Sequence, residues 1–137
     1  MLENPKKLEF TIPIAPQGKK EARRRINGHT YKDPQTRAYM ETIAASIREQ
    51  YQGEPLDLPL SVVYRCYRAR PKSDRKSIWP ATKPDWDNYA KAIGDALTGI
   101  LWLDDGRIVD GRVIKLFADT GLPRIEITLI PLNKNYL

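Results

Sequence analysis

Two pairs of aspartates frame one segment of this sequence, and they are the residues best suited to carry chemistry. Asp85 and Asp87 open the segment, and Asp104 and Asp105 close it. Carboxylate oxygens are the ligands that Mg²⁺ prefers in proteins, and such sites commonly combine one or two carboxylates with oxygens of a phosphate substrate. The pattern therefore predicts a divalent-metal site formed by Asp85, Asp87 and one of the two adjacent aspartates, Asp104 or Asp105.

Lys91 follows Asp87 by four residues, which is one helical turn. In phosphodiester hydrolysis a metal ion activates the attacking water, and a nearby ammonium group can neutralise the phosphate in the transition state. The alternative is that Lys91 only forms an ion pair with Asp87 within the helix. Similarly, Asp85 could serve only as a helix cap, because the positive end of a helix favours a carboxylate.

The segment between the aspartates has the clearest helical pattern in the sequence, beginning at Asp85 or Trp86. Its apolar residues form one broad stripe: Tyr89, Ala92, Ile93, Ala96, Leu97, Ile100 and Leu101. A straight helix from Asp87 to Ile100 would be about 20 Å long, so its two ends could not share one ion. Either the chain after the helix returns alongside it, or a second subunit supplies one set of carboxylates. The sequence leaves this choice open.

The remaining elements give the order β-α-β-α-β-β. Alternating or β-branched residues predict strands over about 8–14, 58–67, 108–117 and 124–131. Asp33-Pro34 predicts the start of a further helix, with Tyr39, Ile43 and Ile47 on its buried face. We therefore expect an α+β (or α/β) fold in which residues 1–137 form a single domain, with two helices packed on a small mixed sheet. Residues 133–137 are expected to be a frayed tail.

The charge of the chain favours a polyanionic partner. Lysine and arginine number 23 against 17 acidic residues, and the net charge is +6. The cations concentrate in two predicted loops, about 17–33 and 68–84, which we interpret as DNA-binding because cations on a surface release counterions from phosphates. The candidates are Lys19, Lys20, Arg23, Arg24, Arg25, Arg68, Arg70, Lys72, Arg75, Lys76 and Lys83. The alternative is that these cations only form a solvated basic surface.

Three single residues add further expectations. Trp79, in the second basic loop, could anchor that loop or stack on an unpaired base. His29 is more typical of a solvent or phosphate contact than of a general base. Cys66, the only cysteine, excludes an internal disulfide and favours a reducing, cytoplasmic setting. No apolar run reaches the length of a membrane span, and residues 1–10 lack the apolar core of a signal peptide.

The acidic segment resembles the RusA family of Holliday-junction resolvases, the crossover junction endodeoxyribonucleases. The resemblance rests on four short motifs: Asp85-x-Asp87-Asn88-x-x-Lys91, Asp95-Ala96-Leu97-Thr98, Trp102-Leu103-Asp104-Asp105 and Val109-Asp110. It implies a small homodimer that depends on Mg²⁺, with Mn²⁺ as a substitute, and nicks two opposed strands of a four-way junction in recombination and repair. It also implies that Asp85, Asp87, Asp105 and Lys91 are the catalytic residues, and that the carboxylates gather near the dimer interface.

The resemblance is close over about residues 83–115 and looser elsewhere. Residues 19–25 are basic where the family more usually has a small-polar, Asn-bearing stretch, and the 68–83 connection is longer than in compact members. Trp86, Trp102 and the outer face of 108–117 are the expected dimer surfaces, although Trp102 could equally be core. Two other functions remain open: a non-catalytic nucleic-acid-binding protein, and a nuclease or RNase of similar chemistry on another substrate.

Overall fold

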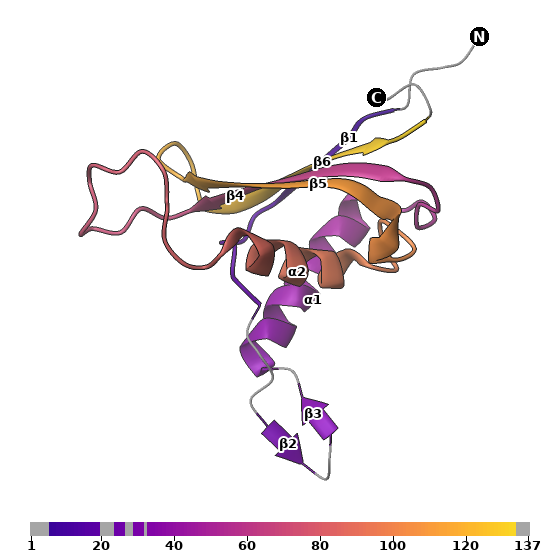
Figure 1. Ribbon diagram of the computed structural model, residues 1–137, viewed down its shortest axis with the longest axis horizontal. Coiled ribbons are helices and arrows are strands. Elements are labelled where there is room, and N and C mark those ends of the chain that lie inside the picture. The colour runs from indigo at the N-terminus through magenta and orange to yellow at the C-terminus, as the bar shows by residue number, and fades with distance from the viewer. Residues whose placement is uncertain (1–5, 20–23, 27–28, 32, 134–137) are drawn as a thin grey trace.

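A mixed four-stranded sheet with two helices on one face forms the body of the protein in a computed structural model, which describes residues 6–19, 24–26, 29–31 and 33–133 (Figure 1). The strands are β1 (Leu8–Ile12), β4 (Leu60–Arg68), β5 (Ile108–Phe117) and β6 (Arg124–Pro131), in the order β1-β6-β4-β5. β6 is antiparallel to both of its neighbours, whereas β4 and β5 are parallel. The predicted α+β class and mixed sheet are confirmed.

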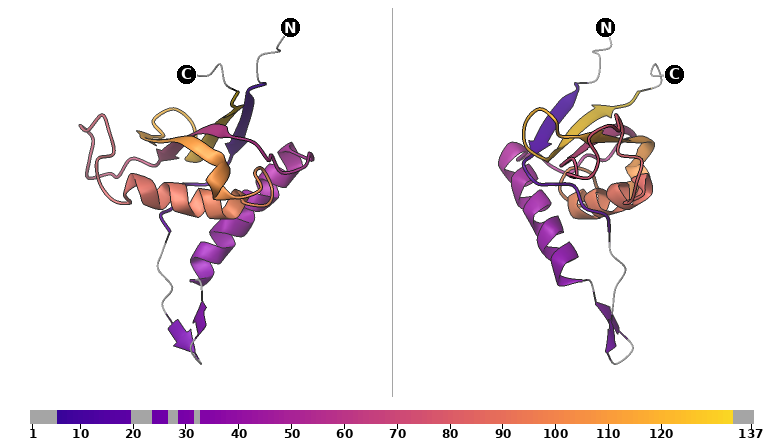
Figure 2. Two further views of the ribbon diagram at one scale, coloured as in Figure 1. Left: turned by 45° about the vertical axis from the view of Figure 1, so that its right-hand side comes forward. Right: turned by 90° about the vertical axis from the view of Figure 1, so that its left-hand side faces the viewer.

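The core lies between the sheet and the helices. β6 shows the reason most clearly, because Ile125, Ile127 and Leu129 alternate with partly exposed residues and are fully buried on one face. β1 contributes Phe10 and Ile12 to the same face. The other face of the sheet carries no helix among the described elements (Figure 2). The side chains that β6 presents on that face are partly exposed.

Helix α1 (Pro34–Gln50) begins where the sequence predicts. The Asp33 carboxylate accepts hydrogen bonds from the backbone N–H groups of Gln35 and Thr36 at 3.1 and 3.2 Å, and proline occupies the first helical turn. Tyr39, Ile43 and Ile47 are buried on one face, as their spacing predicts. A side-chain N-cap and one buried apolar face therefore explain why this segment forms a helix.

Helix α2 (Trp86–Leu97) also begins as predicted, but the chain then folds back instead of running straight on. Residues 98–102 form a tight turn in which Gly99 has a φ of +87°, a left-handed conformation that favours glycine. The turn inserts Trp102 into the core, where it is 0% exposed. Of the expected dimer surfaces, Trp102 is therefore intramolecular core, while Trp86 and Val109 are 61% and 63% exposed.

A two-stranded hairpin occupies the region predicted as the first basic loop. β2 (Arg24–Ile26) pairs antiparallel with β3 (His29–Tyr31), on either side of the sequence Asn27-Gly28. Strands of three residues are too short for an alternating pattern to be recognised in the sequence. The hairpin projects away from the sheet beyond the start of α1 (Figures 1 and 2).

Residues 134–137, most of the predicted tail, lie outside the described part of the chain. Among the described helices, none is long and apolar enough to cross a membrane.

Candidate metal centre along helix α2

The first aspartate of the segment occupies the N-cap position of α2 without using its side chain as a cap. The Asp85 backbone carbonyl accepts from the N–H of Asn88 at 3.1 Å, but its carboxylate accepts no capping hydrogen bond and is exposed. This contrasts with Asp33, whose carboxylate caps α1. A carboxylate at a helix start that leaves the backbone N–H groups alone remains available to an external ligand.

Asp87 and Lys91 form an ion pair across one turn of α2, as the i,i+4 spacing predicts. The Lys91 ammonium nitrogen lies 3.5 Å from Asp87 Oδ2, and the two side chains are 61% and 46% exposed. Exposed pairs of this kind contribute only a few tenths of a kcal/mol. The pair is therefore weak enough for either partner to exchange it for a metal ion or a phosphate.

Asp105, by contrast, is held in place by α2 and the turn after it. Thr98 Oγ1 donates to Asp105 Oδ1 at 2.8 Å, and the indole N–H of Trp102 lies 3.3 Å from the same oxygen. Because the Trp102 ring is fully buried, the direction of its N–H is fixed by packing. Among the described residues none donates to Asp105 Oδ2, which leaves that oxygen available as a ligand.

Gly94 is where the Asp105 turn packs against α2. A Cβ atom added at Gly94 would lie 3.5 Å from Asp105 Oδ1 and 3.9 Å from the hydroxyl of Tyr64, a residue of β4. The Tyr64 hydroxyl is buried and has no hydrogen-bond partner among the described residues. Burial raises the pKa of Tyr64, and the negative charge of Asp105 raises it further, so the phenol stays neutral.

Asp104 holds the turn rather than facing α2. Its Oδ1 accepts from the Gly106 N–H at 2.7 Å, which caps the short helix η1 (Asp105–Arg107), and its Oδ2 lies 3.6 Å from Arg107. Arg107 is held in turn by Asp57 at 2.7 Å. These contacts favour Asp105 over Asp104 as the ligand, a distinction that two adjacent aspartates in a sequence do not reveal.

The candidate residues share one face of α2 but not one point on it. Asp87, Lys91, Gly94 and Thr98 follow one another at steps of four, three and four residues, so they form one stripe along the helix. Asp105 touches this stripe at Gly94 and Thr98, which places it about 10 Å along the axis from Asp87. Within the described residues, no group of three or more His, Cys, Asp or Glu side chains is close enough to hold a metal ion.

The carboxylates therefore fit a hard cation in kind, but one chain presents them as two separate half-sites. We define the N-terminal half-site as Asp85, Asp87 and Lys91, and the C-terminal half-site as Asp105 with Thr98 and Trp102. Carboxylates that bind one Mg²⁺ must each place an oxygen about 2.1 Å from it, which a separation of about 10 Å does not allow. The geometric objection raised by the sequence holds for a single chain.

Asp95 of α2 forms an ion pair that was not predicted from the sequence. Its Oδ2 accepts from the Lys19 ammonium at 2.6 Å, and the Lys19 N–H donates to the Asn88 carbonyl at 3.2 Å. A Cβ at Gly18 would come within 2.8 Å of Pro84, so this strip of chain lies directly against the start of α2. Lys19, predicted to bind DNA, is therefore engaged within the protein.

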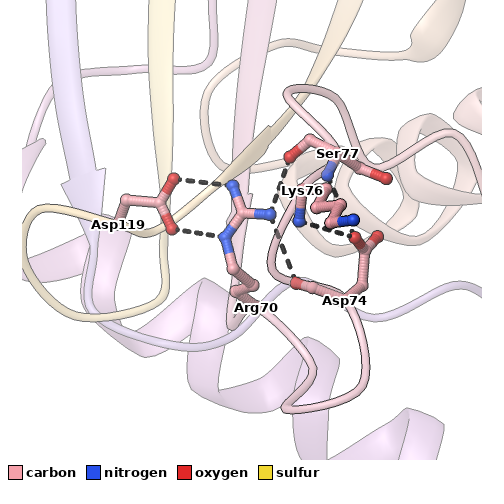
Figure 3. Close-up of polar contacts among 5 residues, drawn as sticks. All are labelled: Arg70, Asp74, Lys76, Ser77 and Asp119. Atoms are coloured by element: carbon pink, nitrogen blue, oxygen red, sulfur yellow. Dashed lines mark hydrogen bonds and ion pairs between the residues drawn. The ribbon is translucent and has the colours of Figure 1, made fainter.

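The second predicted basic loop is braced from within by Arg70. Arg70 Nε and one terminal nitrogen donate to the two oxygens of Asp119 at 2.9 Å each, and its other terminal nitrogen donates to the Ser77 carbonyl at 2.6 Å (Figure 3). The same guanidinium lies 4.1 Å from the centre of the Phe117 ring. Asp74 Oδ1 accepts from the Ser77 N–H at 3.0 Å and closes a local turn.

The end of this loop is fastened to the sheet just before Asp85. Arg68 donates to the Lys83 carbonyl at 2.9 Å, and Lys115 of β5 donates to the Thr82 carbonyl. Arg68 and Arg70 thus support the loop, and both were predicted to contact DNA. Four other candidates on the loop are exposed and have no ion-pair partner among the described residues: Lys72, Arg75, Lys76 and Lys83.

Two candidates of the first basic region, Lys20 and Arg23, lie outside the described residues. The backbone of Arg24 and Arg25 belongs to β2, and their side chains are not described.

Comparison with known proteins gives consistent matches over nearly the whole chain. Residues 12–130 match the family described as "Endodeoxyribonuclease RusA". The crossover junction endodeoxyribonucleases of Escherichia coli strain K12 and of Enterobacteria phage 82 are each 31% identical, over 88% of this chain and 91% of theirs. An uncharacterised Bacillus subtilis protein, YqaN, is 32% identical over 89% of this chain and 94% of its own length.

Proposed function

The chain belongs to the RusA family of endodeoxyribonucleases, and from that premise we propose that it is a metal-dependent nuclease that resolves four-way DNA junctions by paired nicks. The observation that carries this proposal is the state of the carboxylates at the two ends of α2, where the Asp85 side chain is not used as a cap and the Asp105 side chain is oriented by hydrogen bonds. Both residues belong to the acidic motifs on which the sequence-based prediction of the metal site rests.

Asp85, Asp87 and Asp105 would hold Mg²⁺, or Mn²⁺ in its place, with Asp104 supporting the turn. A bound Mg²⁺ supplies positive charge at the scissile phosphate and lowers the pKa of a coordinated water. Lys91 would leave its weak ion pair with Asp87 and place its ammonium against a phosphate oxygen, where charge accumulates in the transition state. Thr98 and Trp102 would keep the Asp105 carboxylate in one orientation, as supporting hydrogen bonds do for metal ligands in general.

A homodimer would complete the site. Because Asp87 and the Asp105 carboxylate both lie along one face of α2, a second copy with its α2 antiparallel to the first would bring Asp87 of one copy near Asp105 of the other. A two-fold axis crossing α2 near Lys91 would repeat this at both ends and create two equal sites. The exposed side chains of Trp86 and Val109 are the apolar surfaces that such an interface would cover.

The DNA would be held by basic residues away from the metal site. The hairpin β2–β3 projects away from the body (Figure 2), and we propose that it lies along a DNA arm. Substituting Glu at Arg23, Arg24 and Arg25 together should therefore flatten the dependence of affinity on salt by roughly one log–log unit for each phosphate that the protein no longer neutralises. We further propose that the protein acts in the cytoplasm, which suits a single buried thiol, Cys66, whose pKa burial raises to about 12.

The test is cleavage of a synthetic four-way junction beside a linear duplex of the same sequence, with and without Mg²⁺. We expect Mg²⁺-dependent paired nicks in the junction only, and a mass of twice 15.7 kDa by sedimentation equilibrium at micromolar concentration. Junction binding without cutting under all metal conditions would instead favour a non-catalytic binding protein. Equal cutting of the duplex or of RNA would favour a nuclease of another specificity.

A further inference from the structure

Two large apolar side chains stand next to each other on the surface of the braced loop. Ile78 is 77% exposed and Trp79 is 60% exposed, in a connection that otherwise consists largely of polar residues and prolines. The sequence left two roles for Trp79, anchoring the loop or stacking on a base. A side chain that anchors a loop is buried against the body, and Trp79 is not.

The backbone on both sides of this pair is fixed. Ser77 donates its N–H to Asp74 and accepts from Arg70 through its carbonyl oxygen (Figure 3). On the other side Pro80 is buried, and the Ala81 N–H donates to the Trp79 carbonyl at 2.9 Å. These contacts hold the backbone that carries the two side chains, which lowers the entropic cost of ordering the loop when a partner binds.

The surroundings of the pair suit a nucleic acid. Lys72, Arg75, Lys76 and Lys83 are exposed on the same loop, whereas its one carboxylate, Asp74, is engaged with backbone N–H groups of the loop. Exposed cations on the same loop as an exposed indole form the combination that binds single-stranded DNA, with phosphates held by charge and a base stacked on the ring. Figure 1 shows this loop at the N-terminal end of α2, well apart from the hairpin β2–β3.

We propose that Ile78 and Trp79 form a wedge that occupies the branch point of the DNA, with Trp79 stacked on a base that has lost its neighbour there. This inference rests on the proposed function, because a branched substrate supplies such a base. It also adds a determinant of the cutting position. Asp85 is the sixth residue after Trp79, so the Cα atoms of the two residues lie at most about 21 Å apart. That distance corresponds to about six nucleotides along a strand.

The experiment uses a four-way junction with 2-aminopurine at the branch point, whose fluorescence rises when the base leaves its stack. The protein carries Asp87→Asn, so that it binds without cutting. We expect binding to change the fluorescence, Trp79→Ala to abolish that change and weaken affinity by about 5- to 100-fold, and Trp79→Phe to retain most of both. The salt dependence of binding should stay the same in all three, because no charge is altered.

A matched control is Leu122→Ala, which removes a side chain that is 79% exposed on the turn between β5 and β6. It should leave fluorescence, affinity and cutting position unchanged. In the cutting protein, Trp79→Ala should spread the nicks over several positions, whereas Leu122→Ala should not.

The possible failures are distinguishable. A parent protein that cuts junctions while Trp79→Ala changes neither affinity, fluorescence nor cutting position would overturn the wedge and leave the proposed function standing. A fluorescence change that depends on Trp79, in a protein that never cuts with any metal, would support the wedge and overturn the nuclease. Loss of the dimer in Trp79→Ala, measured by sedimentation, would assign the pair to a subunit contact and overturn the wedge.

Discussion

A carboxylate lies at each end of helix α2, but the two ends differ in how firmly the carboxylate is held. At its start, the Asp85 and Asp87 carboxylates are accessible, and within the described part of the chain Asp87 has a single ion pair, 3.5 Å long, with the exposed Lys91. At its end, Asp105 accepts two hydrogen bonds from Thr98 and from the buried Trp102. The difference indicates that the fold fixes the orientation of the Asp105 carboxylate, whereas it leaves the carboxylates of Asp85 and Asp87 free to reorient.

The packing around each end explains the contrast. The chain enters α2 from the braced loop, whose contacts through Arg68 and Lys115 hold the backbone at residues 82 and 83 but leave the side chains of the first turn outward. The chain leaves α2 by folding back over it, so that the next carboxylate is pressed against the helix at Gly94. In a dimer, each site would therefore combine one carboxylate of fixed orientation, Asp105, with two that can reorient, Asp85 and Asp87.

The largest effect should come from Asp87→Asn. An amide is a poorer ligand for Mg²⁺ than a carboxylate, so Mg²⁺-dependent nicking should fall by about three orders of magnitude. Binding of the junction should be unchanged or tighter, because the substitution removes a negative charge near phosphate. A gel-shift assay and a nicking assay on the same preparation measure both quantities. Nicking within tenfold of the parent would remove Asp87 from the metal site.

The second effect concerns how the two half-sites combine. A mixed dimer of Asp87→Asn and Asp105→Asn subunits has one site with both substitutions and one with neither, if each site takes Asp87 from one subunit and Asp105 from the other. Such a dimer should nick one strand of a junction at about the parental rate per site, although each variant alone is inactive. Sites built within single subunits would instead leave every mixed dimer inactive.

Differently tagged subunits, purified through both tags, provide that mixed dimer, and a mixed preparation of parent with Asp87→Asn serves as its control. In both arrangements this control has one intact site. It therefore shows what activity one site gives.

The start of α2 was predictable from the sequence, and so was the motif on it, but the contrast between its ends was not. The stripe from Tyr89 to Leu97 fixes which face is buried, so the opposite face with Asp87 and Lys91 follows from periodicity alone. The fold-back of the chain depends on Trp102 reaching the core, which requires contacts with residues far away in the sequence. Local patterns contain no information about such contacts.

The two basic regions show the same limit. A run of cations predicts a charged surface, but it does not reveal that Arg70 is used by Asp119, which lies 49 residues further along the chain. The hairpin β2–β3 was hidden for a different reason, since two three-residue strands carry almost no periodic signal.

The third effect tests whether the hydrogen bond from Thr98 holds the Asp105 carboxylate in its orientation. Thr98→Val keeps the shape of the side chain and removes the hydroxyl that donates to Asp105 Oδ1 at 2.8 Å. Substitutions that remove a hydrogen bond to a metal ligand typically cost about 10- to 100-fold in metal affinity or activity, so the Mg²⁺ concentration for half-maximal nicking should rise by that order. Thr98→Ser, which retains the hydroxyl, should restore the parental value. An unchanged Mg²⁺ requirement would show that Trp102 alone orients Asp105.

The smallest effect tests whether Tyr64 contributes by packing alone or also by a hydrogen bond to Asp105. The Tyr64 hydroxyl is buried near Gly94 and Asp105 without a partner among the described residues, so removing it leaves no donor or acceptor unpaired. Tyr64→Phe should therefore be neutral or raise the free energy of unfolding by up to about 1 kcal/mol, with nicking nearly unchanged. Tyr39→Phe is the matched control, because its hydroxyl accepts from the Gln17 N–H at 3.1 Å and its removal should destabilise by about 1 kcal/mol.

Thermal unfolding of the two variants gives the answer, with shifts of about 3–5 °C per kcal/mol for a chain of this size. Tyr64→Phe could instead unfold at as low a temperature as Tyr39→Phe and raise the Mg²⁺ concentration for half-maximal nicking. That result would mean that the Tyr64 hydroxyl of the parent donates to Asp105, directly or through a water. The C-terminal half-site would then be held by three donors from α2, its turn and the sheet, and the contrast between the two ends of α2 would be larger than the direct contacts indicate.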